Sequence, residues 1–132
     1  MNLWVLAGLV ALAGSVGSLL RWAVDVLLSH RVTQAEHSHV AVFPWALLLV
    51  NVVGSFVCGV ATAQWGHSEW GLVLASGLAG GLTTMSTLAV TSANHFREKK
   101  TVRVALWSLL LHLVLGVSAA WLGLLLGGNP AA

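Results

Sequence analysis

The chain has 132 residues, of which 58% are apolar and 8% are charged, and its mean hydropathy is +0.89. Soluble domains carry about 25% charged residues, so this composition excludes a water-soluble globular protein and an ordinary soluble enzyme. The formal net charge is only +2, and the basic residues lie in loops and at span ends, which argues against a nucleic-acid partner. The remaining class is an integral protein of the lipid bilayer.

Four long uncharged runs predict membrane-spanning helices over about residues 3–28, 43–64, 70–94 and 103–127. Each run holds the roughly 18–20 residues that cross a hydrocarbon core of about 30 Å. The connections are short, so residues 1–132 are expected to form a single four-helix transmembrane domain. All the tryptophans lie near predicted span ends, where indole rings favour the membrane interface: Trp4, Trp22, Trp45, Trp65, Trp70, Trp107 and Trp121.

The first two spans carry small and polar residues in helical register. Gly14 and Ser18 are four apart in the first span, and Ser55 and Gly59 in the second, a spacing that lets helix backbones approach closely. One face of the second span holds four polar positions: Asn51, Ser55, Cys58 and Thr62. This stripe has two readings, helix packing or a polar permeation path. Asn51 favours the path, because a mid-span amide needs partners on both its oxygen and its nitrogen.

The third span contains a run of poor helix formers: Gly77, Gly80, Gly81, Thr83, Thr84, Ser86 and Thr87. Glycine costs about 1 kcal/mol relative to alanine inside a helix, so this run predicts an interrupted helix near mid-membrane. Such breaks free backbone carbonyls and are tolerated where they bind ions or line a cavity. The alternative is a helix that is kinked but unbroken.

In the fourth span, Ser108 and His112 lie four residues apart. We expect His112 to be a neutral, hydrogen-bonded packing residue, with a pH gate as the alternative.

The basic residues are distributed unequally between the two sides of the membrane. Five of them fall in or beside the predicted loops 29–42 and 95–102: Arg31, Arg97, Lys99, Lys100 and Arg103. The other side, made of the two termini and loop 65–69, has no Lys or Arg. The positive-inside rule therefore predicts that both termini face outward and that loops 29–42 and 95–102 face the cytoplasm.

Three segments resemble motifs of the small bacterial Fluc (CrcB) fluoride channels. The first span has a glycine-rich stretch that ends in Arg21 and Trp22. The second has an N-x-x-G-x-F-x-x-G signature that begins at Asn51. The third, G-x-x-G-G-x-T-T-M-S-T-L, runs from Gly77 to Leu88. The three motifs occur in order on successive spans and cover the chain almost end to end.

The resemblance implies a dual-topology dimer of two antiparallel four-helix subunits in the bacterial plasma membrane. It implies a passive, fluoride-selective channel that lets the anion leave the cell. A structural Na⁺ at the dimer centre would be held by carbonyls at Gly80 and Thr83. The fluoride path would run along Asn51, Thr84, Ser86 and Thr87 and the positions of Met85 and Leu88, with Arg21 in a vestibule or a structural role.

The chain departs from the family pattern at the path itself. Met85 and Leu88 stand where the family has phenylalanines, and Thr91 replaces a common glutamate. The Lys and Arg residues on one side of the membrane also make insertion in the opposite orientation unfavourable. We therefore expect a heterodimer with an oppositely inserted paralogue, in preference to a pairing with a second copy of this chain.

Two other functions compete with a conducting subunit. A non-conducting scaffold subunit of a heterodimeric channel fits the loss of both phenylalanines. A proton-coupled drug exporter needs a carboxylate at membrane depth, whereas the four acids lie at span ends or in loops: Asp25, Glu36, Glu69 and Glu98. No nucleophile–base pair, phosphate loop or cofactor motif supports an enzyme.

Overall fold

The computed structural model describes residues 2–32 and 43–128, and these residues form an all-helical bundle. Helix α1 is Leu3–Val32, α2 is Trp45–Trp65 and α6 is Val102–Gly127. The third span consists of four consecutive pieces: α3 (Glu69–Leu72), the π-helix η2 (Val73–Ala79), α4 (Gly80–Leu82) and α5 (Met85–Arg97). Four stretches are long and apolar enough to cross a membrane, which confirms the predicted spans.

The helix ends differ from the predicted bounds by a few residues. Helix α1 continues past residue 28 to Val32, because no Gly or Pro interrupts that stretch. Helix α2 begins at Trp45 rather than at 43. Pro44 precedes it, and its carbonyl accepts the first helical bond, from the Leu48 N–H at 3.0 Å. Most of the predicted loop 29–42 lies outside the described residues.

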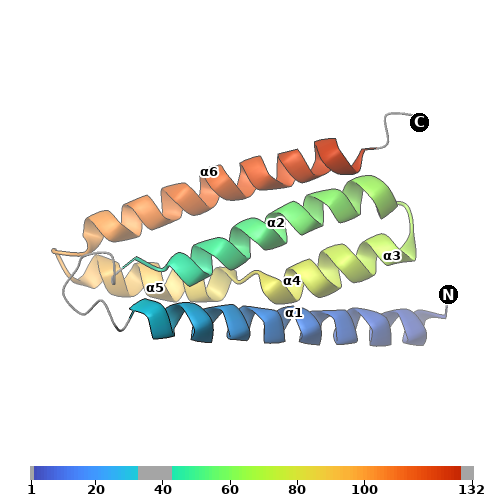
Figure 1. Cartoon of the computed structure of the whole chain (residues 1–132), viewed down its shortest axis with the longest axis horizontal. Coiled ribbons are helices and arrows are strands. Elements are labelled where there is room, and N and C mark those ends of the chain that lie inside the picture. The colour runs from blue at the N-terminus through green and yellow to red at the C-terminus, as the bar shows by residue number, and fades with distance from the viewer. Residues whose placement is uncertain (1, 33–42, 129–132) are drawn as a thin grey trace.

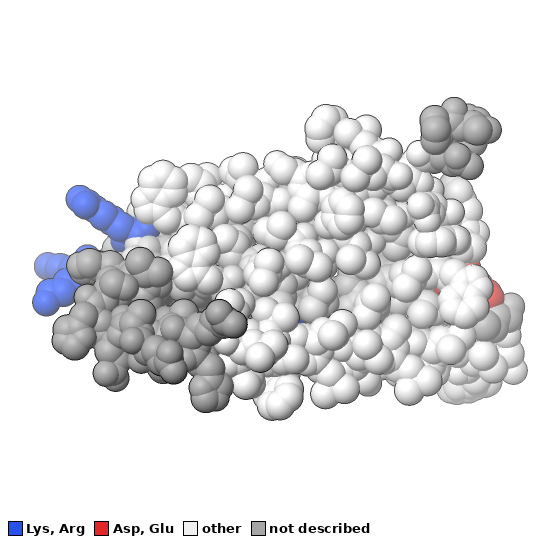
Figure 2. All heavy atoms as spheres, in the orientation of Figure 1, with Lys and Arg blue, Asp and Glu red and all other residues white. Residues whose placement is uncertain are grey.

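The spans run up and down along the long axis of the molecule (Figure 1). The start of α1 and the end of α6 lie at one end of the bundle, together with the turn from α2 to α3. In Figure 2 the Lys and Arg side chains that project from the surface gather at the opposite end, where α5 meets α6. The fold thus groups the helix ends as the sequence predicts: the two termini and the α2–α3 turn lie at one end, and the α5–α6 connection lies at the other.

Glycines set the closest helix contacts. A Cβ on Gly59 of α2 would collide with the Ala120 carbonyl of α6, and one on Gly81 of α4 would collide with the Gly14 carbonyl of α1. Ser18 of α1 also donates a hydrogen bond to the Gly81 carbonyl at 3.4 Å. The small residues of the first, second and third spans therefore act as packing positions, as their spacing predicts.

Much of the apolar surface of the isolated chain is uncovered. In the most apolar 18-residue stretch of α1, only 6% of the residues are buried. The corresponding share for α2 is 33%. The third span and α2 form the centre, while α1 and α6 present leucine and valine side chains outward. This distribution suits a protein whose surroundings are lipid and other helices.

Candidate ion path

The third span is broken at two residues. Thr83 (φ −80°, ψ 157°) and Thr84 (φ −151°, ψ 115°) are both extended, between the end of α4 at Leu82 and the start of α5 at Met85. The π-helix Val73–Ala79 and the glycines at 80 and 81 come just before. The predicted interruption is confirmed, and the unbroken, kinked alternative is wrong.

Asn51 of α2 bonds to both backbone groups of Thr84. Its Oδ1 accepts from the Thr84 N–H at 2.8 Å, and its Nδ2 donates to the Thr84 carbonyl at 3.4 Å. The amide thus supplies the partners that the broken helix no longer provides. Since an amide has two N–H donors, one Nδ2–H is left for another acceptor.

The hydroxyls after the break form a cluster at the start of α5. Thr84 Oγ1 accepts from the Thr87 N–H at 3.3 Å, which makes Thr84 the N-cap of α5. It also donates to Thr87 Oγ1 at 3.1 Å and lies 3.2 Å from Ser86 Oγ. Because Thr87 Oγ1 accepts in this cluster, its own hydrogen remains free to donate to an anion. Ser86 and Thr87 are exposed on the outside of the chain.

The break also leaves two carbonyls without their helical donors. In an α-helix the carbonyl of residue i accepts from the N–H of residue i+4. Here the Thr84 N–H goes to Asn51 and the Thr87 N–H goes to Thr84 Oγ1, so the carbonyls of Gly80 and Thr83 lose those partners. The Thr83 hydroxyl donates back to the Ala79 carbonyl at 3.0 Å. Freed carbonyl oxygens suit a hard cation such as Na⁺, so these two residues fit the predicted site.

Two carbonyls cannot complete the site by themselves. Hard cations take about six or more oxygen ligands, and Gly80 is exposed on the outer surface of the chain. The other ligands would have to come from water or from a second subunit.

Two chambers meet at Thr84. We call the first, of about 460 Å³, the inner chamber, and it lies between α2, the break, α5 and α6. Its lining consists of Asn51, Ser55, Thr83, Thr84, Met85, Leu88, Leu109, His112 and Leu113. The inner chamber therefore brings together four of the predicted path positions, from Asn51 to Leu88. Met85 is 74% exposed on the outer surface, whereas Leu88 is 6% exposed and belongs to the packed interior.

We call the second, of about 220 Å³, the arginine chamber. Its lining consists of Arg21, Trp22, Asp25, Ala46, Leu47, Val50, Thr84 and Thr87. Arg21 Nε is buried without a hydrogen-bond partner, and among the described residues no ion pair joins Arg21 to Asp25. Arg21 thus shares a chamber with Thr87 and with the carboxylate-bearing Asp25.

The structure also places some predicted residues apart from the chambers and adds others. Ser86 and Gly80 line neither chamber, although both lie beside the break. Ser55 and His112 also line the inner chamber, although the resemblance does not imply them as path positions. Ser55 belongs to the polar stripe of the second span, one helical turn from Asn51 on the same face of α2, whereas no spacing within a helix identifies His112.

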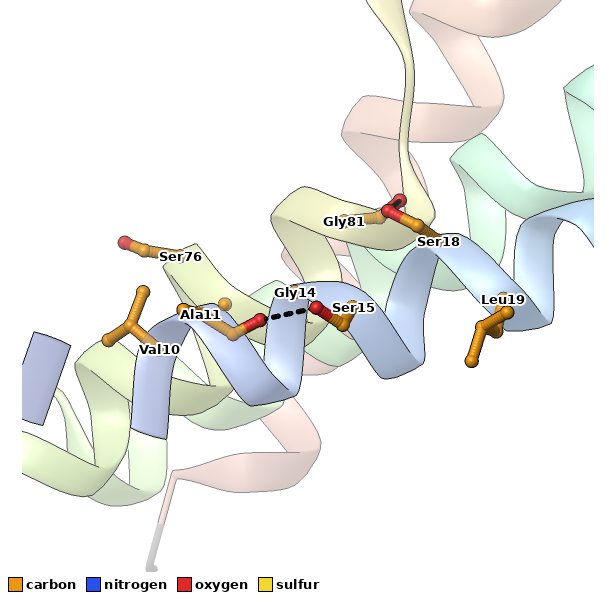
Figure 3. Close-up of a pocket in the computed structure, with 9 residues that line it drawn as sticks. Val10, Ala11, Gly14, Ser15, Ser18, Leu19, Ser76 and Gly81 are labelled. Carbon is orange, nitrogen blue, oxygen red and sulfur yellow. Dashed lines mark hydrogen bonds between the residues drawn. The ribbon is translucent and has the colours of Figure 1, made fainter. Parts of the chain in front are cut away.

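A third hollow, of about 670 Å³, is an open groove along the surface where α1 packs against η2 and α4 (Figure 3). Its walls carry small residues, among them Gly14, Gly77 and Gly81. Two of its serine hydroxyls turn to backbone carbonyls: Ser15 donates to Ala11 at 2.9 Å and Ser18 to Gly81 at 3.4 Å. Ser76 of η2 also lines this groove.

Comparisons with known proteins agree on one family. The family model described as "CrcB-like protein, Camphor Resistance (CrcB)" matches residues 8–124. The chain is 40% identical over 119 residues to the "Fluoride-specific ion channel FluC" of Renibacterium salmoninarum, covering 87% of this chain and 93% of that protein. It is 37% identical to "Fluoride-specific ion channel FluC 1" of Leifsonia xyli, covering 93% and 87%, and 33% identical to the FluC of Vibrio parahaemolyticus, covering 93% and 94%.

Proposed function

The chain belongs to the CrcB family, and from this membership we propose that it is a subunit of a passive, fluoride-selective channel that lowers cytoplasmic fluoride. The family is one of ion channels rather than enzymes, and the four apolar spans make this chain a multi-pass membrane protein. The relatives named above are fluoride-specific ion channels, which supports a fluoride channel here.

The observation that carries this proposal is the break at Thr83 and Thr84, flanked by two chambers that share Thr84. Fluoride is small and strongly hydrated, so a narrow path must replace its water with hydrogen-bond donors. The chambers offer the second Nδ2–H of Asn51, the Thr87 hydroxyl and the guanidinium of Arg21. An inside-negative potential would drive the anion outward, by about 2.3 kcal/mol per charge per 100 mV.

A structural Na⁺ is part of the proposal. The carbonyls of Gly80 and Thr83 would hold it, since the break deprives both of their helical donors. When bound, the cation offsets the electrostatic cost of bringing an anion to membrane depth. Asn51 would keep the break open for it by holding Thr84 in the extended conformation.

We propose that the partner is an antiparallel second subunit, and that a paralogue is favoured over a second copy. Gly80, Met85 and Thr87 are all exposed, so the residues around the break are open to a second subunit. The one-sided distribution of Lys and Arg favours one orientation, with both termini outside. A chain that inserts one way needs a different chain that inserts the other way.

A second candidate is a non-conducting scaffold subunit. Met85 and Leu88 both line the inner chamber but offer no aromatic edge to an anion. In that case the partner would supply the conducting residues, while this chain would supply the packing and the cation ligands.

Fluoride efflux from proteoliposomes, read with an ion-selective electrode and a chloride control, tests the proposal. The chain alone is expected to give no flux, and co-reconstitution with an oppositely inserted paralogue is expected to give selective flux. Flux from the chain alone would exclude an obligate heterodimer. Absence of flux from the folded pair would contradict the channel proposal.

A double substitution separates the conducting subunit from the scaffold. Met85→Phe with Leu88→Phe in the co-reconstituted pair raises the flux only if this chain lines a path. Val90→Phe is the matched control, since Val90 is 62% exposed on α5 and lines neither chamber.

A further inference from the structure

The chain carries most of its fixed positive charge in one short turn. Helix α5 ends at Arg97 and α6 begins at Val102, and residues 97–103 hold four of the six Lys and Arg residues of the chain. We call these four the basic turn, and all of them are exposed: Arg97, Lys99, Lys100 and Arg103. In Figure 2 basic side chains project from this end of the bundle.

The backbone of this turn is held in one conformation by Thr101. The Thr101 N–H donates to the Glu98 carbonyl at 3.0 Å. Thr101 Oγ1 lies 2.8 Å from the His95 carbonyl oxygen and 3.2 Å from that of Glu98, so its hydroxyl hydrogen is used inside the turn. The basic side chains are therefore presented from a fixed backbone, and the entropic cost of binding a ligand falls mainly on the side chains.

Little negative charge offsets the basic turn. Glu98 is the one carboxylate within residues 97–103. Among the residues that the structure describes, no ion pair joins a carboxylate to any of the four cations. Because four like charges within a few residues repel one another, an anion shared between them relieves that repulsion. The basic turn thus favours an anionic ligand from outside the chain.

Exposed aromatic side chains lie directly beside the charges. Phe96 precedes Arg97 and is 44% exposed, and Trp107 of α6 is 60% exposed. Arg103 and Trp107 share one face of α6 because they are four residues apart. Both α5 and α6 belong to membrane spans that end at this turn, where indole rings favour the interface. The surface is cationic at the turn and apolar along the span, which matches a phospholipid better than a soluble anion.

We propose that the basic turn binds anionic phospholipid headgroups in the leaflet at this end of the bundle, with Phe96 and Trp107 against the upper part of the acyl chains. Lys and Arg donate charge-assisted hydrogen bonds to phosphate oxygens, and Arg can do so with two parallel bonds. The start of α1, residues 65–69 and the end of α6 contain no Lys or Arg, so the charge selects the lipids of one leaflet. This inference goes beyond the channel proposal and does not depend on it.

Native mass spectrometry of the full chain in detergent measures this binding. Phosphatidylglycerol is compared with phosphatidylcholine of the same acyl chains, which has the phosphate but no net charge, and inorganic phosphate is added as a competitor. The chain is expected to bind phosphatidylglycerol saturably and phosphatidylcholine weakly, and salt is expected to weaken the binding by screening. Equal binding of the two lipids would overturn the inference. Displacement by inorganic phosphate at the concentration of the lipid would indicate a site for free anions and would also overturn it.

Substitutions of Lys99 and Lys100 locate the bound lipid. Lys99→Gln with Lys100→Gln is expected to weaken the binding of phosphatidylglycerol by about 25-fold, since each cation near an anionic headgroup contributes about fivefold. Lys99→Arg with Lys100→Arg keeps the charge and is the matched control, which is expected to bind as the wild type does. Unchanged binding in the Gln pair would place the lipid elsewhere on the chain and contradict the proposal.

Glu98→Gln guards against misfolding as the cause of these effects. Removal of the one acid among four cations is expected to tighten the binding of phosphatidylglycerol, and a damaged fold does not produce a gain of binding. A bound lipid also stabilises the folded chain by mass action, so phosphatidylglycerol should raise the thermal unfolding midpoint of the wild type more than that of the Gln pair. Binding that Glu98→Gln leaves unchanged or weakens would count against contact with the turn. No fluoride is used, so the outcome is independent of the channel proposal.

Discussion

The side-chain amide of Asn51 pairs with the backbone of Thr84 as a neighbouring peptide would, with Oδ1 2.8 Å from the Thr84 nitrogen and Nδ2 3.4 Å from its oxygen. The two residues are 33 positions apart. This pairing joins α2 to the break, so the residue expected to face the ion also holds the backbone of Thr84 in its extended conformation.

Removal of the amide should therefore affect stability as well as flux. Asn51→Ala leaves the Thr84 N–H and carbonyl without partners, and an unsatisfied buried polar group costs about 1–3 kcal/mol. We expect a lower thermal unfolding midpoint in detergent and loss of flux. Asn94→Ala, at an exposed position of α5, is the control and should change neither. An unchanged midpoint for Asn51→Ala would show that the pairing contributes nothing to stability.

The helix contacts between α2 and α6 should not tolerate even one added methyl group. A Cβ at Gly123 would collide with the Phe56 carbonyl and lie 2.9 Å from Val60 N. Gly123→Ala should destabilise the fold by about 1–3 kcal/mol, measured by thermal unfolding in detergent. A Cβ at Gly8 of α1 would have no atom within 4 Å, so Gly8→Ala should be neutral or slightly stabilising. Equal effects of the two substitutions would contradict the packing described here.

The Thr87 hydroxyl should matter for the anion more than for the fold. It accepts a hydrogen bond from Thr84 but its own hydrogen is free, so Thr87→Val removes a donor from the arginine chamber. We expect reduced flux with a thermal midpoint close to that of the wild type. Thr91→Val, one turn further along α5 and outside both chambers, is the matched control. If Thr91→Val lost as much flux as Thr87→Val, the Thr87 hydroxyl would have no specific role in conduction.

Arg21 should act through its charge. Its guanidinium lines the arginine chamber, and a cation there raises the local concentration of an anion. Arg21→Gln should lower the flux most at low ionic strength, since the Debye length falls from about 30 Å at 0.01 M to about 3 Å at 1 M. Arg103→Gln, at the start of α6, should have a smaller effect. A salt-independent loss would instead indicate a packing role for Arg21.

Removal of sodium tests the proposed cation site. If carbonyls of Gly80 and Thr83 hold Na⁺ in the assembled channel, the ion stabilises the folded state by mass action. Replacement of Na⁺ by choline should then lower the thermal midpoint of the co-reconstituted pair and its flux. A titration with Na⁺ should restore both along a saturable curve. A midpoint independent of Na⁺ would exclude a stabilising site.

The spans and the break could be predicted from the sequence because their causes are local. Hydropathy over about 20 residues defines a span, and the glycines before Thr83 weaken a helix wherever they occur. The packing roles of Gly14, Gly59 and Gly81 follow from the same local spacing.

The partners at the site could not be predicted in the same way. The pairing of Asn51 with Thr84 and the position of His112 on the inner chamber depend on how α2, α5 and α6 are placed along one another. The burial of Leu88 likewise depends on tertiary packing rather than on its place in a motif. No spacing within one helix encodes this placement.

The break makes the third span two half-helices placed end to end, the first ending at Leu82 and the second beginning at Met85. The aligned peptide dipoles of a helix amount to about half a negative charge at its carboxyl end and half a positive charge at its amino end. At Thr83 and Thr84 these opposite ends face each other in the middle of the membrane. Two unwound peptides thus place a partial negative charge beside a partial positive one, which would suit the proposed cation and anion without an ionised side chain at that depth.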